Sequence, residues 1–319
     1  MHAFQRLIRL TRLTRLVAAG TLALCAAGTA LADTRITVGF VPIADLMPLY
    51  VAKEQGFFAK RGLDVTLQAI PINPTIPPAL QSDSIQVGTV TPSVLMQAAD
   101  SGMDLVVIAG GSVLTPASKT PGIVLRNGVA LKTPQDFIGK KVGVAGLGAT
   151  LHVLARKWFA DHGVDPKKVN FVEVALPQMS DVLKGGSVDA VVPTEPFLSR
   201  IVQSGAGSMF AYLSDDFPAA GVMPIAYGVT RDWLQKNTAA ARAFREAREE
   251  SNAFHAKNEA AARADMAKYV KAPPDVFKAL IVPQQASVAT EDHMRFWIDV
   301  MKSQDMLKNS VDAKRLIFK

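Results

Sequence analysis

The feature of this sequence that most restricts its fold is a strand–helix–strand pattern that occurs twice, 105 residues apart. Residues 35–70 contain an alternating apolar stretch, RITVGF, a helical stretch over 49–60 before Gly62, and a second alternating stretch, DVTLQAI. Residues 140–176 repeat this plan with KKVGVAG, HVLARKWFADHG and VNFVEVAL. A period of two predicts strands, and a period of 3.6 predicts helices.

A second pair of similar segments has nearly the same spacing. SIQVGTVTPSVL begins at Ser84, and SVDAVVPTEPFL begins at Ser187, 103 residues later. Both run from a predicted strand into threonine, proline and an apolar helix start, and the second copy has an additional residue, Glu195. Chance similarity between strand–helix units is the alternative explanation. Two matched pairs at one spacing favour two similar α/β lobes.

The remaining segments fit a chain that leaves one lobe and later returns to it. LTPASKTPG (114–122) is rich in proline and glycine, and DDFPAAGVMP (215–224) precedes the strand IAYGVT. We therefore predict that the chain crosses between lobes in these two segments. The predicted division is lobe 1 over residues 33–118 plus 222–319, and lobe 2 over residues 119–221.

The C-terminal part of the chain, from Arg231 onward, is predicted to be mostly helical. Charged residues and alanines alternate over 239–255, which is typical of a solvated helix face. Another amphipathic helix is predicted to begin at Thr290, with Met294 and Trp297 in the core.

The N-terminus predicts export. Residues 1–32 carry four arginines and no acid, then an apolar run, and end on Ala30-Leu31-Ala32, which is typical of a secretory signal peptide. The apolar run is shorter than the about 20 residues of a membrane-spanning helix. The single cysteine, Cys25, lies inside this run. We expect a periplasmic protein without disulfide bonds.

Composition and motifs argue against several function classes. The formal charge of +7 falls to +3 without the four arginines of the signal peptide, and no basic stripe interleaves with aromatic residues, so we expect no nucleic-acid partner. The five histidines lack metal-ligand spacing, and no Gly-x-Ser-x-Gly elbow is present. The sequence therefore predicts no catalytic residue, no cofactor and no metal.

The glycine turn in VGVAGLGATLH resembles a nucleotide-binding loop only superficially. Leu151 stands where a dinucleotide fingerprint needs its third glycine, and Gly-Ala-Thr at 148–150 lacks the lysine of a P-loop. The turn still places backbone N–H groups and Thr150 at a helix start, where they could hold an electronegative group. A plain strand–helix turn is the alternative. His152, just after the turn, is expected on a helix surface, with solute contact as the alternative.

Candidate ligand residues follow the predicted strands, because ligands of open α/β sheets bind at the carboxyl ends of the strands. In a two-lobed protein these ends face a shared cleft. For each loop, capping of its own helix is the alternative role. The predicted ligand-binding residues are Ala44, Asp45, Thr91, Pro92, Ser93, Gly111, Ser112, Gly146, Gly148, Ala149, Thr150, Glu195 and Tyr227.

Four stretches together resemble one protein family. They are GFVPIADLMPLYVAKEQGFFAKRGLDV, VGTVTPSVL, GKKVGV with the glycine turn, and GGSVDAVVPTEPF. The sequence is similar to the periplasmic substrate-binding proteins of ABC importers in the nitrate, sulfonate, taurine and thiamine-precursor group. The resemblance implies the type II two-lobed fold, in which each lobe is a mixed sheet flanked by helices and two crossing strands form a hinge. It also implies a monomer that captures a small solute between the lobes and delivers it to an ABC permease in the inner membrane.

The cleft loops restrict the solute further. They contain no arginine or lysine, which argues against a simple inorganic anion, whereas Asp45 and Glu195 could accept an N–H donor. A zwitterionic sulfonate or carboxylate, or an aminopyrimidine-like molecule, would suit these loops. Two alternatives stay open: an enzyme on the same fold that acts on a pyrimidine-like molecule, and a binding subunit for a sensor or a different transporter type.

We predict that export removes residues 1–32. N-terminal sequencing of the periplasmic protein should begin at Asp33, because Ala30 and Ala32 supply the small residues that signal peptidase requires. A membrane-associated protein that retains the N-terminal segment would contradict this prediction.

Overall fold

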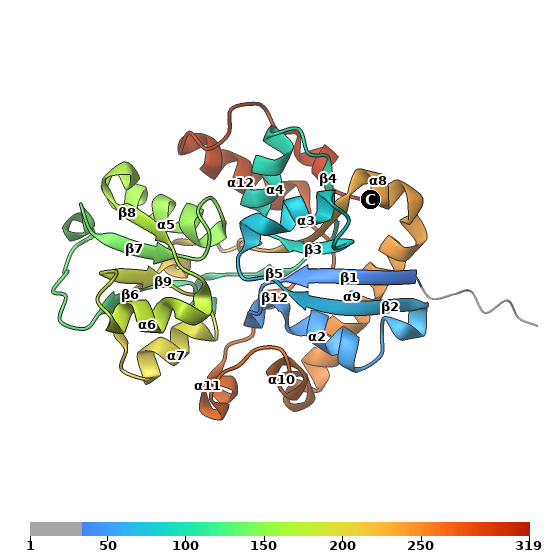
Figure 1. The fold of residues 1–319 in the computed structure, drawn as a ribbon, viewed down its shortest axis with the longest axis horizontal. Coiled ribbons are helices and arrows are strands. Elements are labelled where there is room, and N and C mark those ends of the chain that lie inside the picture. Colours follow the sequence, from blue (N-terminus) through green and yellow to red (C-terminus); the bar gives the residue numbers. More distant parts are fainter. Residues whose placement is uncertain (1–33) are drawn as a thin grey trace, which may run out of the picture. The chain divides into compact units, whose positions relative to one another are not determined.

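Two five-stranded mixed sheets position the candidate site, and both have the same strand order (Figure 1). The computed structural model describes residues 34–319, which form one compact unit; the predicted signal peptide and Cys25 lie outside the described residues. The first sheet has the order β2 (Leu63–Ala69), β1 (Thr34–Phe40), β3 (Val87–Val90), β11 (Ala226–Thr230) and β4 (Leu105–Ala109). The second has the order β8 (Asn170–Glu173), β7 (Lys141–Val144), β9 (Ala190–Val192), β6 (Gly122–Arg126) and β10 (Gly207–Tyr212).

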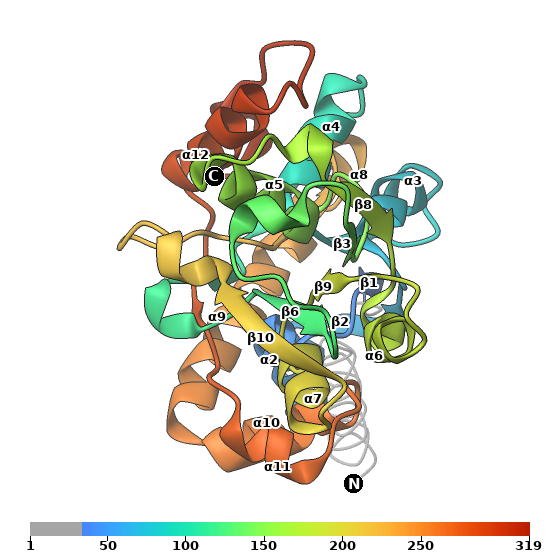
Figure 2. The ribbon, with the colours of Figure 1, turned by 90° about the vertical axis from the view of Figure 1, so that its left-hand side faces the viewer.

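The strand directions confirm the repeat that the sequence predicts. In the first sheet β1 pairs in parallel with β2 and β3, and β11 runs antiparallel to β3 and β4. In the second sheet β7 pairs in parallel with β8 and β9, and β6 runs antiparallel to β9 and β10. The repeated segments at 35–70 and 140–176 therefore occupy equivalent places in the two sheets. Figure 2 shows the second sheet facing the viewer.

The helices are divided between the two sheets. Three helices contact the second sheet: α5 contacts β9, α6 contacts β6, β9 and β10, and α7 contacts β6 and β10. The other helices lie with the first sheet and the C-terminal segments (Figure 1). With the second sheet are α5 (Thr150–Asp161), α6 (Met179–Lys184) and α7 (Phe197–Gln203). The others are α2 (Met47–Glu54), α3 (Ile76–Gln81), α4 (Pro92–Asp100), α8 (Arg231–Lys236), α9 (Thr238–Lys257), α10 (Glu259–Ala267), α11 (Pro274–Ala279) and α12 (Glu291–Ser303).

The chain crosses between the two sheets in two segments that pair with each other. After β5 (Ser112–Val113), which pairs with β12 (Gln284–Gln285), the chain passes to β6; after β10 it returns to β11. The N–H of Leu114 donates to the carbonyl of Val222, and the N–H of Val222 donates to the carbonyl of Leu114, both at 2.8 Å. These two bonds hold the crossing segments together between the sheets.

One predicted helix is shorter in the structure, and another begins where the sequence predicts. The predicted helix over 49–60 ends at Glu54, because Gly56 adopts a φ of +72°, and a short 3₁₀ turn follows at Ala59–Arg61. Helix α12 begins as predicted, with the Thr290 side chain accepting the N–H of His293 and Trp297 fully buried.

The long helix α9 was predicted to present a solvated face, but it also carries a fully buried cation. Arg248 is 0% exposed, packed beside the buried Phe244 and Ala247 on the same helix. Charge alternation cannot reveal this burial, because the pattern of an exposed face is unchanged when one of its cations turns inward. Within residues 34–319 no helix is both long and apolar enough to cross a membrane.

Candidate functional site

A cavity of about 60 Å³ lies where the two sheets face each other. Its lining comes from the segments after β1, β2 and β3 of the first sheet and after β7, β8 and β9 of the second, joined by the crossing segments. These are the carboxyl ends of the parallel strands in both sheets, as expected for ligand sites in open α/β folds. The lining residues are Val41, Ile43, Asp45, Ile72, Asn73, Thr91, Leu114, Pro121, Ala145, Ala149, Thr150, Leu151, Leu176, Thr194, Pro224 and Ile225.

The cavity is small because the two sides touch each other around it. The N–H of Ala44 donates to the carbonyl of Glu195 at 3.0 Å, and the hydroxyl of Thr150 donates to the carbonyl of Pro224 at 2.8 Å. A Cβ atom on Gly146 would lie 2.7 Å from the ring of Pro74, which follows β2. The structure therefore has the two sheets close together, and a larger solute requires them to separate.

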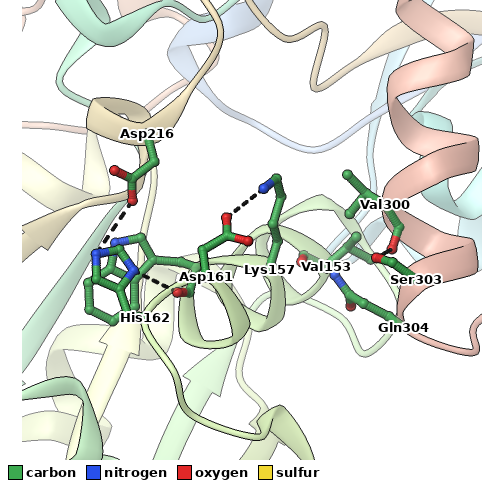
Figure 3. Close-up of polar contacts among 9 residues, drawn as sticks. Val153, Lys157, Asp161, His162, Asp216, Val300, Ser303 and Gln304 are labelled. Atoms are coloured by element: carbon green, nitrogen blue, oxygen red, sulfur yellow. Dashed lines mark hydrogen bonds and ion pairs between the residues drawn. The ribbon is translucent and has the colours of Figure 1, made fainter.

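A further contact between the two sides lies outside the cavity, between α5 and the end of α12 (Figure 3). The side-chain amide of Gln304 donates to the carbonyl of Val153 at 3.1 Å. The guanidinium of Arg156 donates to the amide oxygen of Gln304 at 3.0 Å. Helix α5 is thus held at its middle by the C-terminal helix and at its start by the cavity contacts.

Asp45 is a carboxylate buried in the cavity wall. It lies in a 3₁₀ turn, Ala44–Leu46, directly after β1, and is 3% exposed. The hydroxyl of Ser112 donates to Oδ2 of Asp45 at 2.6 Å, whereas Oδ1 has no hydrogen-bond partner within residues 34–319. Burial raises the pKa of Asp45, and the Ser112 bond opposes that rise. A buried oxygen without a partner is costly, so Oδ1 is a strong candidate to accept a donor from a solute.

Asn73 is a cavity residue that the sequence analysis missed. Its amide donates to the carbonyl of Thr89 at 2.6 Å, and its Oδ1 accepts the N–H of Thr91 at 2.9 Å. Asn73 therefore fixes the segment that carries Thr91 beside the cavity. Its position after β2, at the carboxyl end of a parallel strand, could have identified Asn73 from the sequence. Thr194 lies in a predicted cleft loop, 193–197, but was not among the predicted ligand residues; it pairs its hydroxyl with that of Thr120 at 3.2 Å.

The glycine turn between β7 and α5 directs its N–H groups toward protein atoms. Leu147 donates to the Glu173 carboxylate at 3.2 Å, Gly148 donates to Nδ1 of His152 at 2.8 Å, and Ala149 donates to the carbonyl of Gly146 at 3.2 Å. The turn presents Ala149, Thr150 and Leu151, at the start of α5, to the cavity. Contact between this helix start and a solute stays a prediction.

The expectation that His152 lies on a helix surface is wrong. The residue is 9% exposed, its ring packs edge-on against Phe171 with centroids 4.7 Å apart, and it accepts the Gly148 N–H. Burial lowers the pKa of His152 to about 4, so the ring is neutral at pH 7. His152 serves the glycine turn as an internal acceptor, which explains a histidine four residues after Gly148.

Glu195 and Tyr227 are not part of the cavity lining. Both carboxylate oxygens of Glu195 accept from Ser199, one from its hydroxyl at 2.8 Å and one from its N–H at 3.2 Å. Tyr227 is fully buried, and its hydroxyl accepts from Arg248 at 2.8 Å, with the guanidinium 4.2 Å from the ring centroid. Glu195 thus serves its own helix in this structure, and Tyr227 serves the core; their contact with a solute stays a prediction.

The other predicted site residues divide into three groups. Asp45, Thr91, Ala149 and Thr150 line the cavity. Ser112 contacts the cavity indirectly through Asp45. The residues that belong to the same segments but not to the lining are Ala44, Pro92, Ser93, Gly111, Gly146 and Gly148.

Comparison with known sequences places the chain in a family. The sequence model of the NMT1-like family matches residues 29–271, so the chain belongs to that family. The nitrate/nitrite binding protein NrtA of Nostoc sp. is 26% identical over 239 residues, which are 66% of this chain and 51% of that protein. The bicarbonate-binding protein CmpA of Synechococcus elongatus is 26% identical over 248 residues, with the same two shares. The chain spans about a third to a half of the length of the curated relatives it matches.

Solved structures confirm the predicted fold. The alkanesulfonate-binding protein SsuA from Xanthomonas axonopodis pv. citri, bound to MOPS, superposes with a TM-score of 0.78 at 17% identity, covering 91% of this chain and 99% of that one. The periplasmic nitrate-binding protein NrtA from Synechocystis superposes with a TM-score of 0.73 at 22% identity, covering 88% and 84%. The chain therefore has the type II periplasmic-binding-protein fold.

We predict that His152 makes the stability of the protein depend on pH. In the unfolded chain this ring binds a proton near its ordinary pKa of 6.5, but in the folded protein only near pH 4. The free energy of unfolding should therefore fall as the pH drops from 6.5 to 4, by on the order of 3 kcal/mol from this residue, and then level off.

The His152→Asn variant is the matched control, because its amide oxygen can still accept the Gly148 N–H. Urea unfolding of both proteins, followed by tryptophan fluorescence from pH 7.5 to 3.5, should give curves that converge toward the acid end. A constant difference between the two curves at every pH would show that His152 titrates normally.

Proposed function

We propose that this member of the NMT1-like family is the solute-binding component of an ABC importer. In this proposal the exported protein captures a small organic solute in the cavity between its two sheets. It then delivers the solute to a permease in the inner membrane. The protein binds the solute without changing it.

The cavity is the observation that carries this proposal. Segments from three parallel strands of each sheet meet there, and the two sheets are joined by two paired crossing segments. A site shared in this way is completed only when both sides come together, so solute binding favours the form in which they touch. We propose the lobes as residues 33–118 plus 222–319 and residues 119–221, with the hinge at the Leu114–Val222 pair.

The relatives support the class of function but not a particular solute. They are named for nitrate, bicarbonate and alkanesulfonate, and those ligands belong to the relatives. For this chain we propose a zwitterionic sulfonate or carboxylate, or an aminopyrimidine-like solute. The polar side chains of the described cavity lining, which are Asp45, Asn73, Thr91, Thr150 and Thr194, suit hydrogen bonding to such a molecule.

Closure around the solute is the expected behaviour. Protein purified from the periplasm should retain its solute, which mass spectrometry of the denatured protein would detect. Small-angle scattering should show a larger radius of gyration after the solute is removed by unfolding, dialysis and refolding. The original value should return when the released solute is added back.

The alternative hypothesis, an enzyme on the same fold, predicts a different result. A solute that is converted to a new product by stoichiometric amounts of purified protein would contradict a pure binding role. Equal radii of gyration with and without a bound solute would contradict closure, and the hinge assignment would fall with it.

A further inference from the structure

The charge of the cavity wall restricts the chemistry of the solute. Within the described lining, Asp45 supplies the one charged side chain, and the remaining polar groups are an amide and hydroxyls. A nitrate-like anion placed in this cavity would meet a buried carboxylate and no cation. Like charges at close range in a poorly solvated site repel strongly.

A second buried acid lies close enough to Asp45 to influence it. Glu195 is 8% exposed, and its backbone carbonyl accepts the N–H of Ala44, the residue before Asp45. Burial raises the pKa of Glu195, and the negative charge of Asp45 raises it further. Asp45 comes from the first sheet and Glu195 from the second, so bringing the two sides together concentrates negative charge.

The protein groups around Asp45 leave one of its oxygens unused. Ser112 donates to Oδ2 at 2.6 Å, and the side-chain amide of Gln285 donates to the backbone carbonyl of Asp45 at 3.2 Å. The buried cation Arg248 bonds instead to Tyr227 and to the carbonyl of Gly110, outside the cavity lining. Oδ1 therefore remains without a donor from residues 34–319.

The opposite wall has the reverse polarity. Thr150 and Leu151 line the cavity at the start of α5, a helix of 12 residues. The first N–H groups of a helix have no carbonyl partner within it, and they attract an electronegative group. The cavity thus has an acceptor on the first-sheet side and a weakly positive helix start on the second-sheet side.

We infer that the solute carries an N–H group that donates to Oδ1 of Asp45, and that Asp45 thereby makes the site select against oxyanions without an N–H. This inference rests on the proposed binding function and narrows its solute class. An ammonium or amino group satisfies the unpartnered oxygen and reduces the repulsion between the two acids. An anionic or ring-nitrogen end of the same molecule would face the start of α5.

Matched pairs of probes test the inference on the wild-type protein alone. We would measure calorimetric affinities for taurine against ethanesulfonate, for 4-aminopyrimidine against pyrimidine, and for nitrate. The amino member of a pair should bind about 10- to 100-fold more tightly, the range for a hydrogen bond to a charged group. The inference would be overturned if an amine-free member bound as tightly as its amino partner. It would also be overturned if nitrate bound as tightly as the amino members.

Two variants then locate the preference. Asp45→Asn keeps the shape of the side chain but places a neutral amide at the cavity wall. The ratio of affinities between the amino member and its amine-free partner should therefore fall to about 1. Asp64→Asn removes an exposed acid from β2 of the same sheet and should keep the full preference. Folding of both variants is checked by circular dichroism. A preference that survives in folded Asp45→Asn would overturn the inference.

A wild-type protein that binds none of these probes is tested with a low-molecular-mass extract of the source cells, passed over immobilised protein. Retained solutes that carry an N–H and are lost with Asp45→Asn support the inference. A retained oxyanion without an N–H overturns the inference but leaves the binding function intact. Retention of no solute counts against the proposed function itself, and the inference then falls with it.

Discussion

A carboxylate buried without a counter-charge is the constraint on which the account of this protein depends. Oδ1 of Asp45 has no hydrogen-bond partner within residues 34–319, and only Oδ2 accepts a hydrogen bond, from the hydroxyl of Ser112. Such an arrangement costs stability in the empty protein, since the charged form is poorly solvated. In our proposal it becomes favourable when a donor enters the cavity, so the feature that destabilises the empty site would also provide affinity.

Close approach between the two sheets is the second requirement. The glycine turn permits it, because Cβ atoms on Gly146 and Gly148 would lie within 2.7 Å of Pro74 and Gln97 on the other side. Both glycines also have positive φ, of +101° and +82°. The turn that resembles a nucleotide loop is therefore a contact surface whose N–H groups bond internally, and His152 holds it in shape.

The sequence was sufficient to predict the architecture and part of the candidate site. Periodicity and the 105-residue repeat predicted the strands, because a half-buried strand such as β2, which alternates buried and exposed residues at its start, leaves a period of two in the sequence. Ligands of open α/β sheets bind at the carboxyl ends of the strands, and this rule predicted Asp45, Thr91 and Thr150, which line the cavity. Asn73 and Thr194 were not among the predicted ligand residues, because many polar residues follow strands and only packing shows which of them line the cavity. Arg248 and His152 were assigned to surfaces because burial of a single polar side chain leaves no periodic signal.

A crystal structure of the protein purified with its native solute would test the central claim most directly. The account predicts density for the solute in the cavity between the sheets, with a nitrogen atom about 2.8 Å from Oδ1 of Asp45. Its electronegative end should lie at the start of α5. Density for a solute elsewhere, or an oxyanion oxygen facing Asp45, would contradict the account.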